Sequence, residues 1–272
     1  MIHTRLAAIM PENEPMRWRD RIARFLFRHR LRGAVRFHQF ACKGAPITGR
    51  TKHGIILQLN PYEYVDGFVL RCGYYEEEVL KAVTQGIRPG DVFWDIGSNL
   101  GLHALTMAKR GKEIRVYAFE PNPALAKAIR RGVQANAVRV EVMECALDNQ
   151  DGTASFYLYE GNNGRSGLHN WEHTAGLKTI EVATARAMSL VTDQRVAPPN
   201  VIKLDVEGNE LRVLQGMEGI LDDRRLRTVV FEDAKDEDSE VKRLLRSKGF
   251  TIARLERLED THHDLENYTA QR

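Results

Sequence analysis

The most constraining feature of the chain is the stretch from Asp91 to Gly101, which reads Asp-Val-Phe-Trp-Asp-Ile-Gly-Ser-Asn-Leu-Gly. Its apolar run lies between the turn signal of residues 89–91 and a segment rich in glycine, which predicts a buried strand that ends in a tight turn. Residues 100–110 are mostly apolar and end in basic side chains before Gly111, a pattern typical of a helix. A strand, a glycine turn and a helix begin an open α/β sheet, in which ligands bind at the carboxyl ends of the strands. The turn is therefore the predicted cofactor site.

The residues of this turn narrow the class of ligand. Their spacing is D-x-G-x-N-x-G, at Asp95, Gly97, Asn99 and Gly101. A dinucleotide would need G-x-G-x-x-G, and the charge of Asp95 repels phosphate, so an NAD-dependent dehydrogenase is disfavoured. A carboxylate beside glycines instead suits S-adenosylmethionine (SAM), because the acid can face the amino group while the backbone approaches closely. The alternative is an ordinary turn before a helix.

Acidic residues also follow the next two predicted strands. Residues 114–119 form a strand that ends at Glu120, about twenty residues after the turn, where an acid can accept hydrogen bonds from ribose hydroxyls. The alternative for Glu120 is an acid at the start of the helix predicted over residues 124–135. The strand over residues 138–143 is followed by Asp148, which could meet an adenine amino group.

A second chemical stretch lies at residues 201–210, where an apolar strand again ends in acids and a glycine. In a doubly wound sheet this fourth strand lies beside the first, so Asp205 and Glu207 are expected to face the reacting group. One of these two acids is the candidate catalytic base. Lys203 is expected to pair with one of them. The alternative is that both acids cap the helix that follows. No spacing of histidines and acids requires a metal, although Asp205, Glu207 and Glu232 could gather around one.

The formal charge of +3 hides a basic segment near the N-terminus. Eight arginines and a single acid, Asp20, lie between Arg17 and Arg36, so the remainder is mildly acidic. A helix is predicted from Met16, with an apolar stripe formed by Trp18, Ile22, Phe25 and Leu26. Either this stripe packs on the domain and the arginines are solvated, or the helix binds an anionic membrane surface. We expect a basic helical arm over residues 1–50 and a catalytic domain over residues 51–272.

Length and composition indicate one α/β domain with an appended segment. Three cysteines without metal or disulfide spacing suit a reducing cytoplasm. The sequence contains no run of about 18 apolar residues, the length that is needed to span a bilayer. The N-terminus also lacks the pattern of a secretory signal. We therefore expect a cytoplasmic protein that could associate peripherally with a membrane.

The remaining segments predict further elements. Residues 51–75, including 68–70, are expected to form short strands or a hairpin, followed by a helix to about Gln85. Strands are predicted over residues 155–159, 180–183 and 228–232, with helices at 188–190 and 237–247. Residues 250–255 and 265–269 should close the sheet as an antiparallel pair. The polar loop over residues 160–170 is expected to form a lid, a substrate contact or a hairpin connection.

Four motifs together resemble the FkbM-type SAM-dependent methyltransferases. They lie at residues 95–101, 119–122, 146–148 and 202–210, and the resemblance covers about residues 70–255. The family usually has alanine at the position of Ser98. The basic arm lies outside the resemblance.

The resemblance implies a Rossmann-like α/β fold of class I methyltransferases, with a mostly parallel seven-stranded sheet and helices on both faces. It also implies O-methylation of a hydroxyl on a sugar, glycan, glycolipid or natural product. It implies that the methionine part of SAM is surrounded by Asp95, Gly97, Asn99 and Gly101, the ribose by Glu120 and the adenine by Asp148. The further cofactor-binding residues expected within these motifs are Ser98, Pro121 and Asn122. Asp205 and Glu207 would line the reaction centre.

Two other functions stay open. Methylation of RNA is suggested by the arginines, which could bind phosphates, but the acidic body disfavours nucleic acid. A SAM-fold scaffold without activity is disfavoured by the intact set of acids. The sequence determines neither the acceptor nor the oligomeric state.

Overall fold

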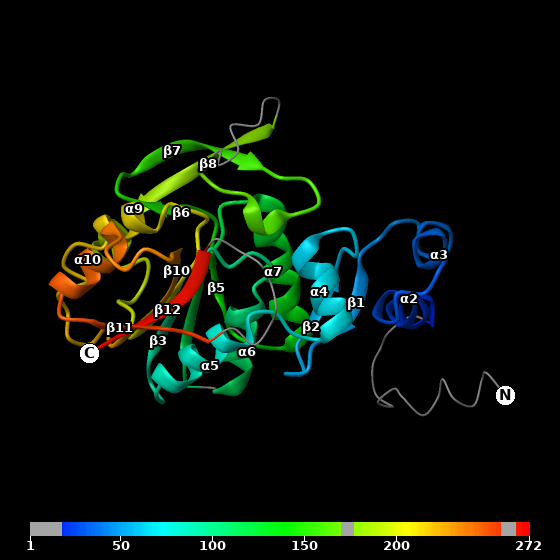
Figure 1. Cartoon of the computed structure of the whole chain (residues 1–272), viewed down its shortest axis with the longest axis horizontal. Helices are drawn as coiled ribbons and strands as arrows, with labels where there is room; N and C mark the ends of the chain where they lie inside the picture. The colour runs from blue at the N-terminus through cyan, green and yellow to red at the C-terminus, as the bar shows by residue number, and fades with distance from the viewer. Residues whose placement is uncertain (1–17, 112, 170–176, 257–264) are drawn as a thin grey trace.

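The computed structural model describes residues 18–111, 113–169, 177–256 and 265–272. Its main sheet has seven strands, in the order β11 (Thr251–Arg254), β12 (Leu265–Gln271), β10 (Thr228–Ala234), β9 (Val201–Leu204), β3 (Val92–Ile96), β4 (Arg115–Phe119) and β5 (Glu141–Met143). Strands β5, β4, β3, β9 and β10 are parallel, whereas β12 runs antiparallel to both of its neighbours. The predicted antiparallel closure of the sheet is therefore confirmed (Figure 1).

The first predicted strand lies at the centre of the sheet. In β3, Asp95 is paired with Ala118 of β4 on one side and with Lys203 of β9 on the other. The prediction that the first and fourth core strands are neighbours is thus confirmed, since β3 pairs with β9. Because these strands are parallel, their carboxyl ends meet at one edge of the sheet. The loops that follow neighbouring strands diverge there, which leaves a crevice in which a ligand can bind.

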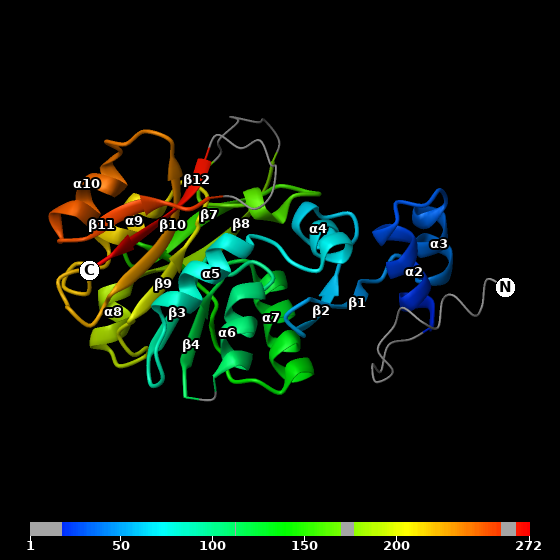
Figure 2. The ribbon, with the colours of Figure 1, turned by 60° about the horizontal axis from the view of Figure 1, so that its bottom comes forward.

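Helices cover both faces of the sheet. On one face lie α5 (Glu77–Gly86), α6 (Leu102–Arg110) and α7 (Pro123–Asn136), and on the other lie α8 (Ala187–Thr192), α9 (Glu210–Gln215) and α10 (Glu240–Ser247). Figure 2 shows the first three side by side over the parallel strands. The expected class of α/β fold is confirmed.

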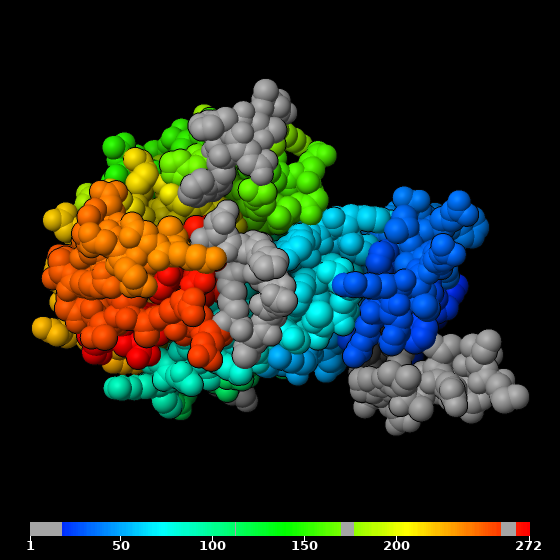
Figure 3. All heavy atoms as spheres, viewed as in Figure 1, coloured from blue at the N-terminus to red at the C-terminus, as the bar shows by residue number. Residues whose placement is uncertain are grey.

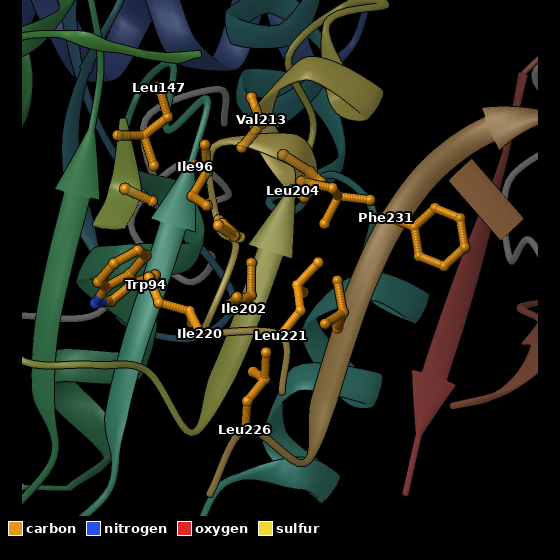
Figure 4. Close-up of a cluster of buried hydrophobic side chains, with 14 of the residues drawn as sticks. Trp94, Ile96, Leu147, Ile202, Leu204, Val213, Ile220, Leu221, Leu226 and Phe231 are labelled. Atoms are coloured by element: carbon orange, nitrogen blue, oxygen red, sulfur yellow. The ribbon is translucent and has the colours of Figure 1, made fainter. Parts of the chain in front are cut away.

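Alternating side chains of the strands supply the two cores. Phe93 of β3 packs with α5 and α6, whereas Trp94 and Ile96 point to the opposite face. There they join Ile202 of β9 and Val213 of α9 (Figure 4). The period of two along each strand explains why a short, almost continuous apolar run signals a strand that is buried on both faces.

A second sheet of three strands lies beside the main one (Figure 1). Its order is β6 (Ala146–Asp148), β8 (Lys178–Arg186) and β7 (Gly152–Leu158). The strands predicted near 155–159 and 180–183 are confirmed as β7 and β8. The loop after β7 contains a short 3₁₀ helix, η1 (Asn163–Arg165), and Tyr157 pairs with Gly167 across it. Its predicted last residue, Asn170, lies outside the described residues.

The N-terminal segment contains α2 (Trp18–Arg28), α3 (Ala34–Ala41) and a hairpin of β1 (Ile47–Arg50) with β2 (Ile56–Leu59). The hairpin spans residue 50, so it joins the predicted arm to the body. The start of the predicted first helix, at Met16, lies outside the described residues.

One predicted strand is wrong. Residues 68–70 belong to the helix α4 (Tyr64–Cys72), in which Val65 and Val69 are buried one turn apart. Gly67 reads as a strand boundary in the sequence, but in the helix it allows close packing, since a Cβ atom there would lie 3.3 Å from the carbonyl oxygen of Pro61. Gly73, with φ of 81°, ends the helix and donates its N–H to Val69.

Candidate active site

A cleft of about 940 Å³ opens at the carboxyl ends of β3, β4, β9 and β10. Its walls also come from α4, from the start of α5, from β6 and β7, and from the loop around η1. The predicted site residues that line it are Gly97, Asn99, Glu120, Pro121, Asp205 and Glu207. The glycine turn of residues 95–101 and the acidic segment of residues 201–210 therefore line the same cleft.

The other predicted residues lie behind this surface. They are Asp95, Ser98, Gly101, Asn122 and Asp148, and all but Gly101 have buried polar side chains bonded within the protein. Direct contacts of these residues with a cofactor stay predictions. Their hydrogen bonds within the protein support the residues that line the cleft.

The glycines of the turn are required by space as well as by conformation. Gly97 has φ of 73°, and a Cβ atom there would lie 1.7 Å from the carbonyl oxygen of Asp205. Gly101 also has φ of 73°, and its Cβ would touch Ile129 of α7 at 3.0 Å. Both positions favour glycine because left-handed backbone is costly for other residues. The close approach at Gly97 joins the turn after β3 to the end of β9.

Asp95 supports the helix that follows the turn. Its side chain is 0% exposed, and Oδ2 accepts a hydrogen bond from the backbone N–H of Ala104 at 2.9 Å. The first N–H groups of a helix have no partner within it, and the residue that caps α6, Gly101, has no side chain. Asp95 supplies the missing acceptor. The carboxylate is buried behind the turn, and its predicted contact with the amino group of SAM stays a prediction.

Glu120 lines the cleft and organises the turn beside it. Its two oxygens accept hydrogen bonds from the backbone N–H groups of Asn99, at 2.8 Å, and Asn122, at 2.9 Å. Burial raises its pKa to about 7, although these two N–H groups oppose the shift. Each carboxylate oxygen has a second lone pair, so Glu120 can still accept hydrogen bonds from a pair of ligand hydroxyls.

Two buried amide oxygens at the cleft have no hydrogen-bond partner among the described residues. They are the side-chain oxygens of Asn99, in the turn, and of Asn209, at the start of α9. A buried acceptor left unsatisfied costs about 1–3 kcal/mol, which a ligand N–H would recover. These atoms fit a ligand with amino groups, such as SAM. Asn209 lies within the motif of residues 202–210, but the sequence assigned it no role.

Asp148 is held by an arginine. Its carboxylate accepts from Nε of Arg212 at 2.7 Å and from Nη2 at 2.9 Å, which keeps its pKa below the usual value despite partial burial. The residues just before it, Ala146 and Leu147, line the cleft together with Phe156 of β7. An apolar wall of this kind suits an aromatic ring. The predicted adenine contact of Asp148 stays a prediction, and the neighbouring wall is the part that faces the cleft.

Three carboxylates converge at the other end of the cleft. One carboxylate oxygen from each of Asp205, Glu207 and Glu232 lies within 4.8 Å of the corresponding oxygens of the other two residues. Glu76, which precedes α5, also lines this region. The three residues suggested as a possible metal set are therefore brought together. We call Asp205, Glu207 and Glu232 the acid cluster.

Two of the three acids in the cluster have raised pKa values. Burial, followed by the charges of Asp205 and Glu210, raises the pKa of Glu207 to about 9. Burial and the same neighbouring acids also raise the pKa of Glu232 well above its usual value. Such a cluster can share a proton or hold a divalent cation, because either reduces the repulsion between carboxylates.

A buried lysine connects the cluster to the turn. Nζ of Lys203 lies 3.0 Å from Oδ2 of Asp205 and donates to the carbonyl oxygen of Gly97 at 2.8 Å. Burial opposes the charged form, but Asp205 and Asp95 outweigh it and raise the pKa of Lys203. The predicted pairing of Lys203 with one of the two acids is confirmed, and its partner is Asp205.

This fold and site define a class I methyltransferase, in which a glycine turn follows the central strand. Residues 95–252, more than half of the chain, match the family described as the methyltransferase FkbM domain. The chain belongs to the FkbM methyltransferase family, and it is an enzyme of the methyltransferase class. The family and its fold imply SAM as the cofactor.

Relatives with assigned names agree with this family. The chain is 30% identical over 195 residues to the 31-O-demethyl-FK506 methyltransferase FkbM of Streptomyces tacrolimicus, covering 61% of this chain and 75% of that protein. It is 32% identical over 186 residues to the hexuronic acid methyltransferase AglP of Haloferax volcanii, covering 68% of this chain and 74% of that protein. Among solved structures, the methyltransferase FkbM of Methylobacillus flagellatus aligns with a TM-score of 0.45 and 13% identity, covering 76% of this chain and 52% of that one.

Proposed function

We propose that this protein binds SAM and transfers its methyl group to a hydroxyl of a sugar, a glycan or glycolipid, or a natural product. The observation that carries the proposal is the position of the acid cluster, which shares one cleft with the glycine turn. The names of two relatives, one acting on an O-demethylated natural product and one on a hexuronic acid, support the same class of acceptor.

The two ends of the cleft suit the two reactants. Asn99 and Glu120 offer acceptors for amino and hydroxyl groups, and Leu147 and Phe156 offer an apolar wall. We therefore assign this end to SAM. The end near β9 and β10 contains the acid cluster, so we assign it to the acceptor hydroxyl.

The acceptor end also has groups that suit a polyhydroxylated molecule. Tyr64 and Tyr75 present aromatic rings to the cleft, and Arg165 of η1 lines it with a cationic group. Aromatic surfaces with a few polar groups are typical of small-molecule sites. Arg165 also lowers the pKa of Glu207 against the larger effect of burial, so it lies within electrostatic reach of the acid cluster.

The acids of the cluster have different parts in our proposed reaction. Bound SAM supplies an electrophilic methyl group, and an alcohol that attacks it must lose a proton. Glu207 is protonated at neutral pH, since its pKa is about 9, so it can donate a hydrogen bond. We assign the base to Asp205, which lies between Lys203 and the other two acids of the cluster. Much of the rate enhancement would come from holding the two reactants in line.

Two other functions are less consistent with the site. Methylation of RNA would bring phosphates to a cleft that contains the carboxylates of Glu76 and Asp205, and like charges repel. A scaffold without activity would gain nothing from several buried acids that raise each other's pKa values, because this arrangement is costly.

The proposal is tested by methyl transfer from labelled SAM to a panel of glycans, uronic acids and hydroxylated natural products. Transfer that is abolished by Asp205→Asn and largely kept by Glu207→Gln is the expected result, because glutamine resembles the protonated acid. Activity only on RNA, or equal loss in both variants with SAM binding intact, would contradict the assigned roles.

A further inference from the structure

The two N-terminal helices expose their largest apolar side chains. Trp18 of α2 is 67% exposed and Phe40 of α3 is 90% exposed, and Ile22, Leu31 and Val35 are also exposed. These five, with Tyr62 and Tyr64, are the exposed large apolar residues of the described part of the chain. Most of this exposed apolar surface therefore lies on α2, on α3 and on the turn between them.

The predicted apolar stripe of α2 packs on the protein only in part, because Trp18 and Ile22 are exposed whereas Phe25 and Leu26 are half-buried. The helix turns Asp20, Ala23 and Phe27 towards the body. In α3 the buried positions are Ala34 and His38, one turn apart, and Nε2 of His38 is bonded to Ala45 at 2.8 Å. The structure therefore leaves Trp18 and Ile22 of the stripe uncovered, and the choice between a solvated helix and a membrane-binding helix stays a matter for the proposal below. The exposed apolar side chains of the two helices are therefore available to another surface.

Basic side chains surround this apolar surface. Arg28, Arg30, Arg32 and Arg36 are exposed and form no ion pair with a described residue. The two helices lie at one end of the molecule, shown in blue in Figure 3, away from α10 at the other end. The same surface thus combines aromatic and aliphatic groups with unneutralised positive charge.

We propose that α2 and α3 dock on the surface of an anionic phospholipid membrane. Trp18 and Phe40 would enter the interfacial layer, where aromatic rings are favoured, and the four arginines would contact lipid phosphates. Among the described residues no helix is long and apolar enough to cross a membrane, so the contact is peripheral. α2 also packs against α4, whose Tyr64 and Val65 line the cleft, so the docked surface adjoins the proposed active site.

Charge decides the choice of partner. If a second copy of this chain bound through the same surface, the arginines of the two copies would face each other and repel. RNA would satisfy the arginines but would leave isolated aliphatic residues such as Ile22 and Val35 in water. A bilayer with anionic lipids satisfies both the charged and the apolar groups.

Co-sedimentation with vesicles tests this proposal in the full-length protein. Vesicles with equal parts of phosphatidylcholine and phosphatidylglycerol should bind it, pure phosphatidylcholine should bind far less, and salt should weaken binding. Replacing Arg28, Arg30, Arg32 and Arg36 by glutamine should weaken binding more than about tenfold. The control replaces Lys235, Arg243, Arg246 and Arg254, exposed at the far end, by glutamine, and it should bind as the wild type does.

Tryptophan fluorescence tests the apolar part separately. The chain has three tryptophans, of which Trp94 is buried and Trp171 lies outside the described residues. A blue shift on adding vesicles that is present in the wild type and lost in Trp18→Phe therefore reports insertion of Trp18. Trp18→Ser with Phe40→Ser should lower vesicle binding by about tenfold or more, with an unchanged circular dichroism spectrum. The proposal would be overturned if the variant that lacks the four arginines of α2, α3 and the turn between them bound vesicles as well as the variant that lacks the four basic residues at the far end. Binding to an RNA homopolymer without vesicle binding, or a dimer that Phe40→Ser dissociates, would also overturn it.

Discussion

Lys203 and Asp205, two residues apart at the end of β9, form an ion pair of 3.0 Å directly beside the glycine turn. The same ammonium group is 3.7 Å from Asp95, below the turn. The turn that we assign to the cofactor and the acid cluster that we assign to the acceptor are therefore joined through one buried charge.

Lys203→Met should destabilise the protein strongly. It would leave the fully buried Asp95 without its nearest positive charge, and breaking a buried ion pair by removing one partner costs about 3–5 kcal/mol. Urea unfolding measures this loss. Arg225→Met is the control, because it removes an exposed partner of Asp223 and should leave stability unchanged within error. Equal losses in both variants would contradict the structural role of Lys203.

Gly97→Ala should be far more damaging than the same change at Gly249. Both glycines have positive φ, at 73° and 82°, so both substitutions carry the cost of left-handed backbone, about 1–2 kcal/mol. Only at Gly97 would the new Cβ collide with a backbone atom, the carbonyl oxygen of Asp205, since nothing lies within 4 Å at Gly249. Thermal unfolding of the two variants measures the difference. Similar stabilities would show that the turn and β9 are not in close contact.

Stability should fall as the pH rises through the range in which Glu207 loses its proton. Burial raises the pKa of this carboxyl from 4.5 to about 9, so the folded protein keeps a proton that the unfolded chain releases. Between these values the free energy of unfolding decreases with pH, by at most about 1.4 kcal/mol per pH unit for one proton. Glu207→Gln should flatten this slope.

Urea unfolding at pH 6 and pH 9 tests the effect of Glu207. The exposed Glu218→Gln serves as the matched control and should keep the wild-type slope. A Glu207→Gln protein with the same pH dependence as the wild type would contradict the protonated state that we assign to Glu207.

Local patterns predicted the central part of the fold. The strand and turn from residue 91 to 101 are visible because apolar residues, glycines and an asparagine lie close together in the chain. The strand that ends before Asp205 was found in the same way, and its place beside β3 follows from the rules of doubly wound sheets. Helix α4 was missed because three adjacent apolar residues at 68–70 gave no clear period.

Side-chain directions at the site were less predictable, because they depend on partners far away in the chain. Asp148 points to Arg212 rather than into the cleft, and Asp95 points to the first turn of α6. Glu76 was not predicted, since only the packing of α5 on the sheet brings it to the cleft. The outward position of Trp18 likewise depends on which face of α2 the body accepts.

Calorimetric titration with SAM, and separately with NAD, is the most direct measurement of the central claim, that the cleft beside the glycine turn binds SAM. We expect micromolar binding of SAM and none of NAD. Asn99→Ala should weaken SAM binding about tenfold or more, because it removes a buried acceptor from the cleft. Asn149→Ala, which removes a similar buried acceptor outside the cleft, should bind SAM as the wild type does. Absence of SAM binding in the wild type, or equal affinities in Asn99→Ala and the wild type, would contradict this account of the site.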